Sequence, residues 1–235
     1  MIQTDRVEQL ALRHGLRPGA AVRLRALLDL LDGDPHTPSA VTAPEQAIDT
    51  HLGDSLSALE LEPLRAARRI VDIGSGAGLP GLALAIALPQ TQVSLVESLA
   101  RRCDFLERAC VATATANAHV VNARVEAWPD GIGDHDVATA RAVGPLALLC
   151  EYAAPLLALG GTLVAWKGSV GEDEQAAGAR AAGELGLEPA GVVRSRPYPC
   201  SQTHHFHMYV KTTETPSRFP RRPGIARKRP LGVPR

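Results

Sequence analysis

The apolar residues of this chain have the periodicity of helices at the start, and from about residue 67 segments with strand and helix patterns alternate. Residues 4–15 and 18–33 carry apolar side chains at the spacing of amphipathic helices. Residues 32–44 are polar and rich in proline, which predicts a loop. Helical turns are expected again over residues 45–61, and Pro63 marks the junction to the alternating segments.

Short apolar segments alternate with helical segments from residue 67 onward. The predicted strands are 69–73, 92–96, 119–122, 136–141 and 161–167, and the predicted helices are 81–88, 99–116, 145–159 and 172–185. Repeated crossover helices indicate a parallel sheet that is covered on both faces. Residues 192–195 and 205–211 predict an antiparallel hairpin at the sheet edge. The sequence therefore indicates an α/β protein with a doubly wound, Rossmann-like sheet.

These patterns predict three parts of the chain: a helical extension (1–62), a sheet domain (63–213) and a tail (214–235). The chain has 25 basic and 25 acidic residues, but residues 217–235 hold seven basic and no acidic ones, which leaves a net charge of −7 on the rest. The four prolines of this segment exclude a helix or a strand there. A cationic tail on an acidic body indicates an arm for a polyanion, and the alternative is a solvated tail without a partner.

A glycine-rich loop follows the first predicted strand and carries the clearest chemical signal. Asp72 is followed by Gly74, Gly76 and Gly78 in the pattern D-x-G-x-G-x-G. Glycine lets a backbone pass close to a ligand because it has no side chain and accepts positive φ. Leu79 breaks the G-x-G-x-x-G pattern of nicotinamide dinucleotide sites, and no Lys-Ser/Thr pair of a phosphate loop follows. The pattern resembles the first motif of S-adenosylmethionine (SAM) methyltransferases, and the alternative is a tight turn without a ligand.

The ends of the next strands supply further candidates, because ligands of such sheets bind at the carboxyl ends of strands. Glu97 follows the second strand at the distance usual for a carboxylate that accepts ribose hydroxyls, and the alternative is a solvated acid. The backbone of Val125 and Glu126, after the third strand, is expected beside the adenine ring, unless this segment is an ordinary turn.

Two cations and three histidines complete the candidates. Arg141 ends the fourth strand and Lys167 the fifth, and two cations at one cleft predict an anionic substrate. His204, His205 and His207 invite a metal site, but no cysteine or acid completes tetrahedral spacing nearby. We therefore predict no metal.

Composition favours a soluble enzyme of a reducing cytoplasm. Hydrophobic residues make up 45% and aromatic ones only 3%, so leucine, alanine and valine must fill the core. No apolar run approaches the roughly 18 residues of a membrane span, and the first residues show no signal pattern. The four cysteines lack ligand spacing.

Several segments together resemble one bacterial family, glucose-inhibited-division B (GidB, also RsmG), the 16S ribosomal RNA guanine-N7 methyltransferases. The matching segments are H-L-G-D-S-L (51–56), V-D-I-G-S-G-A-G-L-P-G (71–81), E-S-x-x-R-R-x-x-F-L-E (97–107), N-A-R-V-E (122–126), R-A-V-G-P-L (141–146) and W-K-G (166–168). The tail segment P-R-R-P-G-I-A-R-K-R-P-L (220–231) is similar to the R-x-P-G-x-x-x-K-x-P-L ending of many members.

The resemblance implies a SAM-dependent methyltransferase fold with SAM as cofactor, and it extends to single residues. The implied SAM contacts are Gly74, Leu79, Val125, Glu126 and Arg141. The implied RNA-side residues are His51, Asp54, Pro80, Lys167 and the basic tail, in which Arg221, Arg222 and Lys228 would hold phosphates together with Lys167.

The implied reaction methylates N7 of a guanine in the decoding-region loop near position 527 of 16S rRNA. N7 carries a lone pair and no proton, so no general base is expected. The implied partner is 16S rRNA, within the small subunit or its precursor, and the protein itself is expected to be a monomer.

This chain departs from many members in two places. Residues 39–42 read S-A-V-T where many members have an Asn-Leu-Thr motif, and His205 stands where many have an arginine before the last strand. Two other classes remain open: a methyltransferase for a small acid or amine, and a non-catalytic RNA-binding factor that retains a SAM pocket.

Overall fold

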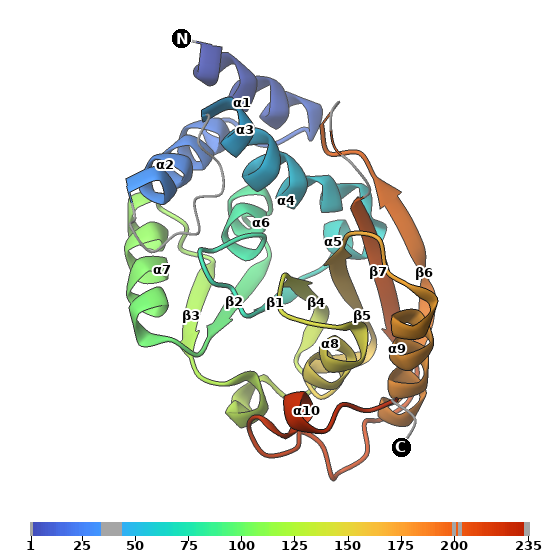
Figure 1. Cartoon of the computed structure of the whole chain (residues 1–235). Coiled ribbons are helices and arrows are strands. Elements are labelled where there is room, and N and C mark those ends of the chain that lie inside the picture. The colour runs from blue at the N-terminus through green and yellow to red at the C-terminus, as the bar shows by residue number, and fades with distance from the viewer. Residues whose placement is uncertain (1, 34–43, 199–200, 202–203, 233–235) are drawn as a thin grey trace.

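One mixed sheet of seven strands forms the centre of the protein (Figure 1). The computed structural model describes residues 2–33, 44–198, 201 and 204–232. The strands lie in the order β3-β2-β1-β4-β5-β7-β6. Their bounds are β1 Arg69–Ile73, β2 Gln92–Glu97, β3 Ala118–Asn122, β4 His135–Arg141, β5 Leu157–Lys167, β6 Leu187–Ser195 and β7 His204–Lys211.

The strand pairing confirms the predicted sheet. β1 pairs in parallel with both β2 and β4, β2 with β3, and β4 with β5. β7 is antiparallel to β5 on one side and to β6 on the other, so β6 and β7 form the predicted hairpin at one edge. The fold is the Rossmann-like fold with an antiparallel hairpin that the sequence indicated.

Two helical layers cover the two faces of the sheet. Neighbouring residues of a strand point to opposite faces, so each strand contributes side chains to both layers. Ile70 packs into a core shared with α6 (Gly81–Ala87) and α7 (Ala100–Ala112). Val71 packs into the opposite core with α8 (Leu146–Ala153), and α9 (Glu172–Leu185) lies beside α8 on that face.

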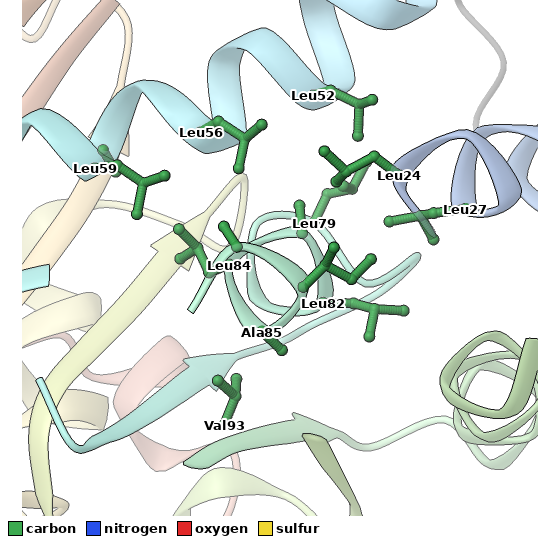
Figure 2. Packing of buried hydrophobic residues seen from close by; sticks show 14 of the residues in the cluster. Leu24, Leu27, Leu52, Leu56, Leu59, Leu79, Leu82, Leu84, Ala85 and Val93 are labelled. Carbon is green, nitrogen blue, oxygen red and sulfur yellow. The ribbon is translucent and has the colours of Figure 1, made fainter. Parts of the chain in front are cut away.

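The helical extension closes the first of these faces. It contains α1 Ile2–Arg13, α2 Ala20–Gly33, α3 Pro44–Ala47, a π-helical turn η1 Ile48–Gly53, α4 Asp54–Ser57 and a 3₁₀ turn η2 Ala58–Glu60, and α5 Glu62–Ala66 connects it to β1. Leu56 of this segment points towards Leu84 of α6, and Leu52 points towards Leu24 of α2 (Figure 2). The extension and the sheet therefore share one continuous hydrophobic core.

Several predicted element ends were wrong, and so was the prediction of a tail without helix. The strand predicted over residues 192–195 is β6, which begins at Leu187. The helix predicted to end at residue 116 ends at Ala112, and the one predicted to end at residue 159 ends at Ala153. β5 begins at Leu157 because the apolar residues there fit a strand as well as a helix, and Gly160, with a φ of 81°, lies inside that strand. The tail, predicted to lack helix, contains one turn, α10 Ile225–Lys228. A single turn fits between two prolines that would break a longer helix.

No helix within the described residues is both long enough and apolar enough to cross a membrane. The predicted loop over residues 32–44 and the S-A-V-T departure at residues 39–42 fall mostly or wholly on residues 34–43, which lie outside the described part of the chain.

Candidate cofactor and substrate cleft

The candidate site lies where the sheet reverses its winding. β1 is flanked by β2 and β4, so the chain leaves β1 towards one side and later returns to the other. In open α/β sheets this reversal leaves a crevice at the carboxyl ends of the strands. The glycine-rich loop starts at that end of β1, and Glu97 and Arg141 close the neighbouring strands β2 and β4.

All three glycines of the loop have positive φ, 69° at Gly74, 55° at Gly76 and 86° at Gly78. A Cβ on Gly74 would lie 3.0 Å from a methyl carbon of Val143, and one on Gly78 would lie 3.1 Å from a methyl carbon of Leu106. Other residues rarely adopt this backbone, and the space beside it is already filled. The loop is therefore shaped so that its backbone forms the surface of the cleft.

Asp72 is buried at the end of β1 and supports the glycine loop from inside the protein. Its side chain is buried, Oδ1 accepts a hydrogen bond of 2.7 Å from Thr139 Oγ1, and Oδ2 accepts one of 3.2 Å from the Gly81 amide. Burial raises the pKa of this carboxyl group. The sequence predicted Asp72 in the cofactor site, and its contacts tie β1 to β4 and to the start of α6.

Glu97 lies at the inner wall of the cleft and is 4% exposed. Its Oε1 accepts backbone N–H groups of Ser98 at 2.7 Å and Leu99 at 2.9 Å, and Oε2 accepts that of Gly76 at 3.1 Å. The Arg102 guanidinium is 3.4 Å from Oε2 and its side chain is 41% exposed. This salt bridge is longer than the three contacts of Glu97 with backbone N–H groups.

Two hollows meet at Gly74, one on each side of the loop. The small hollow, of about 80 Å³, is bordered by Glu97, the segment from Ala123 to Glu126, Val143, Tyr152 and Arg227. The large hollow, of about 860 Å³, is bordered by α2, the glycine loop, His51, Arg141 and the arginines 101, 102 and 108 of α7. The small hollow brings together Glu97 and residues 125–126, for which the sequence predicted contacts with ribose and adenine.

Polar side chains gather around Asp54, which contacts Arg141 at the border of the large hollow. Asp54 is 4% exposed, and its carboxylate binds Arg141 at 2.8 Å and His204 Nδ1 at 3.0 Å. Its carbonyl accepts a hydrogen bond of 3.2 Å from Trp166 Nε1. The sequence assigned Arg141 to the cofactor and Asp54 to RNA, and it left His204 without a role. The structure joins all three.

His51 lines the large hollow beside this cluster. Burial, and after it the charge of Arg141, lower the pKa of His51 below its usual value near 6.5. At neutral pH the imidazole is therefore uncharged. Ala142, which also borders this hollow, has a φ of 58°, a left-handed backbone conformation that is rare for a residue with a Cβ.

Two cations that the sequence predicted at the RNA side are engaged inside the protein. Lys167 Nζ lies 2.7 Å from Glu174 and donates to the Gly144 carbonyl at 3.2 Å. Arg221 forms a two-pronged ion pair with Glu151, whose side chain is 2% exposed. Lys167 therefore joins the fifth strand to α9, and Arg221 anchors the tail.

The other predicted RNA-side residues differ in how exposed they are to solvent. Arg222 and Lys228 are exposed in the tail, whereas Pro80 is buried beneath the loop, after a cis peptide bond. His205 pairs with Lys167 across β5 and β7. Among the residues that the structure describes, no group of three or more His, Cys, Asp or Glu side chains is arranged to hold a metal ion.

The tail contributes to the cleft in a way that sequence reasoning missed. The Gly224 amide donates a hydrogen bond of 2.9 Å to Glu126 Oε1, and Arg227 Nη2 donates one of 3.4 Å to the Val143 carbonyl. A signal was present in the Pro223-Gly224 pair, which indicates a turn, and Gly224 has a φ of 82°. The partner of that turn could not be read from the chain.

Comparison with known proteins decides the family. Residues 34–197 match the family model described as rRNA small subunit methyltransferase G, also called GidB. The chain belongs to this family. The protein is therefore a methyltransferase, and its cofactor is SAM, as the resemblance implied.

Relatives of the rRNA small subunit methyltransferase G family cover most of the chain. The "Ribosomal RNA small subunit methyltransferase G" of Rubrobacter xylanophilus is 43% identical over 194 residues, which cover 80% of this chain and 74% of the relative. The protein of the same name from Desulfitobacterium hafniense is 37% identical over 196 residues, which cover 82% of this chain and 81% of the relative.

Solved structures share the fold. The SAM-dependent methyltransferase SibL matches with a TM-score of 0.56 at 14% identity, over 83% of this chain and 70% of SibL. A 16S rRNA (adenine(1408)-N(1))-methyltransferase from Catenulisporales acidiphilia matches with a TM-score of 0.53 at 17% identity, over 65% of this chain and 88% of that chain.

The polar groups that line the cleft match the polar groups of SAM. The cofactor has vicinal ribose hydroxyls, which suit the carboxylate of Glu97, and an adenine edge, which suits the backbone at residues 125–126. Its methionine part needs a backbone without side chains, which Gly74 and Gly76 provide.

Proposed function

We propose that this protein transfers the methyl group of SAM to N7 of a guanine in 16S rRNA. The observation that carries the proposal is the pairing of the glycine loop with Glu97 at the reversal point of the sheet, in a chain of the rRNA small subunit methyltransferase G family. The target guanine is the one that the resemblance implies, in the decoding-region loop.

The assignment of cofactor contacts follows the two hollows. Glu97 binds the ribose hydroxyls, and the backbone of Val125 and Glu126 binds the adenine edge. Gly74, Gly76 and Leu79 border the large hollow, where the methionine part lies. Gly78 and Asp72 support the loop from its other side. Arg141, fixed by Asp54 and by the Thr50 carbonyl, stands at the mouth of the large hollow and orients what enters it.

The reaction needs little proton chemistry from the protein. SAM supplies an electrophilic methyl group on a positively charged sulfur, and N7 of guanine offers an in-plane lone pair. The main task of the chain is to hold the two in line, because orientation can supply a large part of a rate enhancement. The guanine ring becomes positively charged during transfer, and an uncharged His51 adds no repulsion in the hollow.

Access of RNA is supported by the size and the charge of the large hollow. Its volume of about 860 Å³ leaves room for a base beside the cofactor. N7 lies in the deep groove of an RNA helix, so the guanine must be unpaired or turned out of the stack. Arg101 and Arg108 lie on α7 at the rim, and Arg222 and Lys228 are exposed in the tail, so these side chains are suited to phosphate.

We propose that the protein acts as a monomer in the cytoplasm, on 16S rRNA within the small subunit or its precursor.

A complementation experiment tests the proposal. A strain that lacks this protein is supplied with the wild type, with Glu97→Gln, or with Glu107→Gln as a control on the exposed face of α7. The proposal expects mass spectrometry of 16S rRNA to find N7-methylguanine with the wild type and the control. Loss of a charged hydrogen-bond acceptor is worth about 1.5–3 kcal/mol, so Glu97→Gln should weaken SAM binding roughly 10- to 100-fold.

The outcomes separate the alternatives. An unmethylated guanine in cells with the wild-type protein would reject the rRNA assignment and return a small-molecule substrate to consideration. Restored ribosome assembly by Glu97→Gln, without methylation, would favour a non-catalytic RNA-binding factor.

A further inference from the structure

The basic tail is built into the protein beside the cofactor cleft. Arg221 is paired with the buried Glu151 of α8, and Arg180 of α9 donates a hydrogen bond of 2.7 Å to the Gly232 carbonyl. Phe219 is 8% exposed and Ala226 is 1% exposed, so apolar side chains of the tail also enter the core. Figure 1 shows α10 beside α8.

The tail is joined directly to the segment that faces adenine. Glu126 follows β3 and accepts the Gly224 amide at 2.9 Å, although the two residues are 98 positions apart. The left-handed backbone of Gly224 turns the chain so that α10 starts immediately afterwards. The tail thereby fixes the position of the backbone on which adenine binding depends.

Arg227 stands at the border of the small hollow, with Gly74, Glu97 and Glu126 around the same space. Its side chain is exposed, and its guanidinium donates a long hydrogen bond of 3.4 Å to the Val143 carbonyl. Tyr152 borders the same hollow, and burial raises the pKa of its phenol while a hydrogen bond with Arg227 opposes the rise.

We propose that Arg227 is a cofactor-contacting residue that stacks its planar guanidinium on the adenine ring of SAM, so that the tail completes the adenosine end of the site. Guanidinium groups stack well on nucleobases and aromatic faces, which ammonium groups do less well. This inference rests on the proposed function only in taking SAM as the ligand, and the identity of the RNA does not enter it.

Binding of S-adenosylhomocysteine, measured by calorimetry without RNA, tests the inference. This product keeps the adenosine of SAM, so it reports the proposed contact without any turnover. Arg227→Ala should weaken its binding roughly three- to thirtyfold, as expected for loss of a cation–π contact. Arg227→Lys, which keeps the charge and loses the plane, should fall between Arg227→Ala and the wild type.

A matched control lies five residues earlier. Arg222 is exposed in the same tail and does not border the small hollow, so Arg222→Ala should bind S-adenosylhomocysteine within twofold of the wild type. Circular dichroism melting of each variant verifies the fold, and Arg227→Lys provides the reading if Arg227→Ala does not fold. Wild-type affinity in a folded Arg227 variant would overturn the inference. Failure of the wild type itself to bind would instead overturn the proposed function.

Discussion

Four histidines of this protein, His14, His51, His135 and His207, have pKa values lowered mainly by burial. His135 is 2% exposed and lies against the Leu156 carbonyl and Ser94 Oγ. Its folded pKa lies below the unfolded value near 6.5, so between the two values the unfolded chain binds more protons. Stability is complete above about pH 6.5 and decreases as pH falls through this window.

We therefore expect urea unfolding to give a lower free energy at pH 5.5 than at pH 7.5. His135→Gln removes one titrating group, so the difference between the two pH values should become smaller than in the wild type. Equal pH dependence in the wild type and His135→Gln would contradict the assignment.

The start of α6 depends on a residue with no side chain. All seven residues of α6 are buried, and its first residue is Gly81. A Cβ on Gly81 would lie 2.6 Å from both Asp72 Oδ2 and Leu95 Cδ2. The intrinsic helix propensity of alanine is therefore outweighed here by overlap with β1 and β2.

Gly81→Ala is expected to destabilise the protein by about 1–3 kcal/mol, the usual range for an overpacked core. Gly183→Ala, in α9, is the matched control, because its added Cβ meets nothing within 4 Å. There alanine should stabilise the protein by up to about 1 kcal/mol through helix propensity. Thermal and urea unfolding of both variants measure the two signs, and a stabilised Gly81→Ala protein would refute the packing argument.

Elements were predictable from the sequence where local signals decide them. The bounds of β1 and α9 agree with the prediction at both ends, since turn residues and clear periodicity flank them. Glu97 and the glycine loop came together as predicted, because the strand ends bring them to one edge. The Asp54–His204 pair joins residues 150 positions apart, so no local pattern could reveal it. The same holds for the tail beside the small hollow.

At the scale of the whole molecule, an ion pair between Arg221 and Glu151 anchors the tail to α8. Glu151 is 2% exposed and Arg221 is 21% exposed, and the Arg229 carbonyl accepts a further hydrogen bond of 2.9 Å from the same guanidinium. Breaking such a pair from one side leaves a buried charge without a partner.

Arg221→Gln is therefore expected to lower the free energy of unfolding by about 3 kcal/mol and to release the tail. Brief trypsin treatment followed by mass spectrometry should show faster cleavage after Arg218 and Arg227 than in the wild type. Arg222→Gln is the neighbouring control, because its side chain is exposed, and it should unfold like the wild type. An unchanged tryptic pattern in Arg221→Gln would argue against anchoring.

The hydrogen bond from Gly224 to Glu126 also sets an order of events during synthesis. Translation delivers Glu126 long before Gly224, since the two residues are 98 positions apart. A chain that stops before residue 221 therefore lacks both the donor to Glu126 and the arginine that pairs with the buried Glu151. Such a shortened product is expected to be less stable than the full chain, so a late stop codon would lower the amount of folded protein.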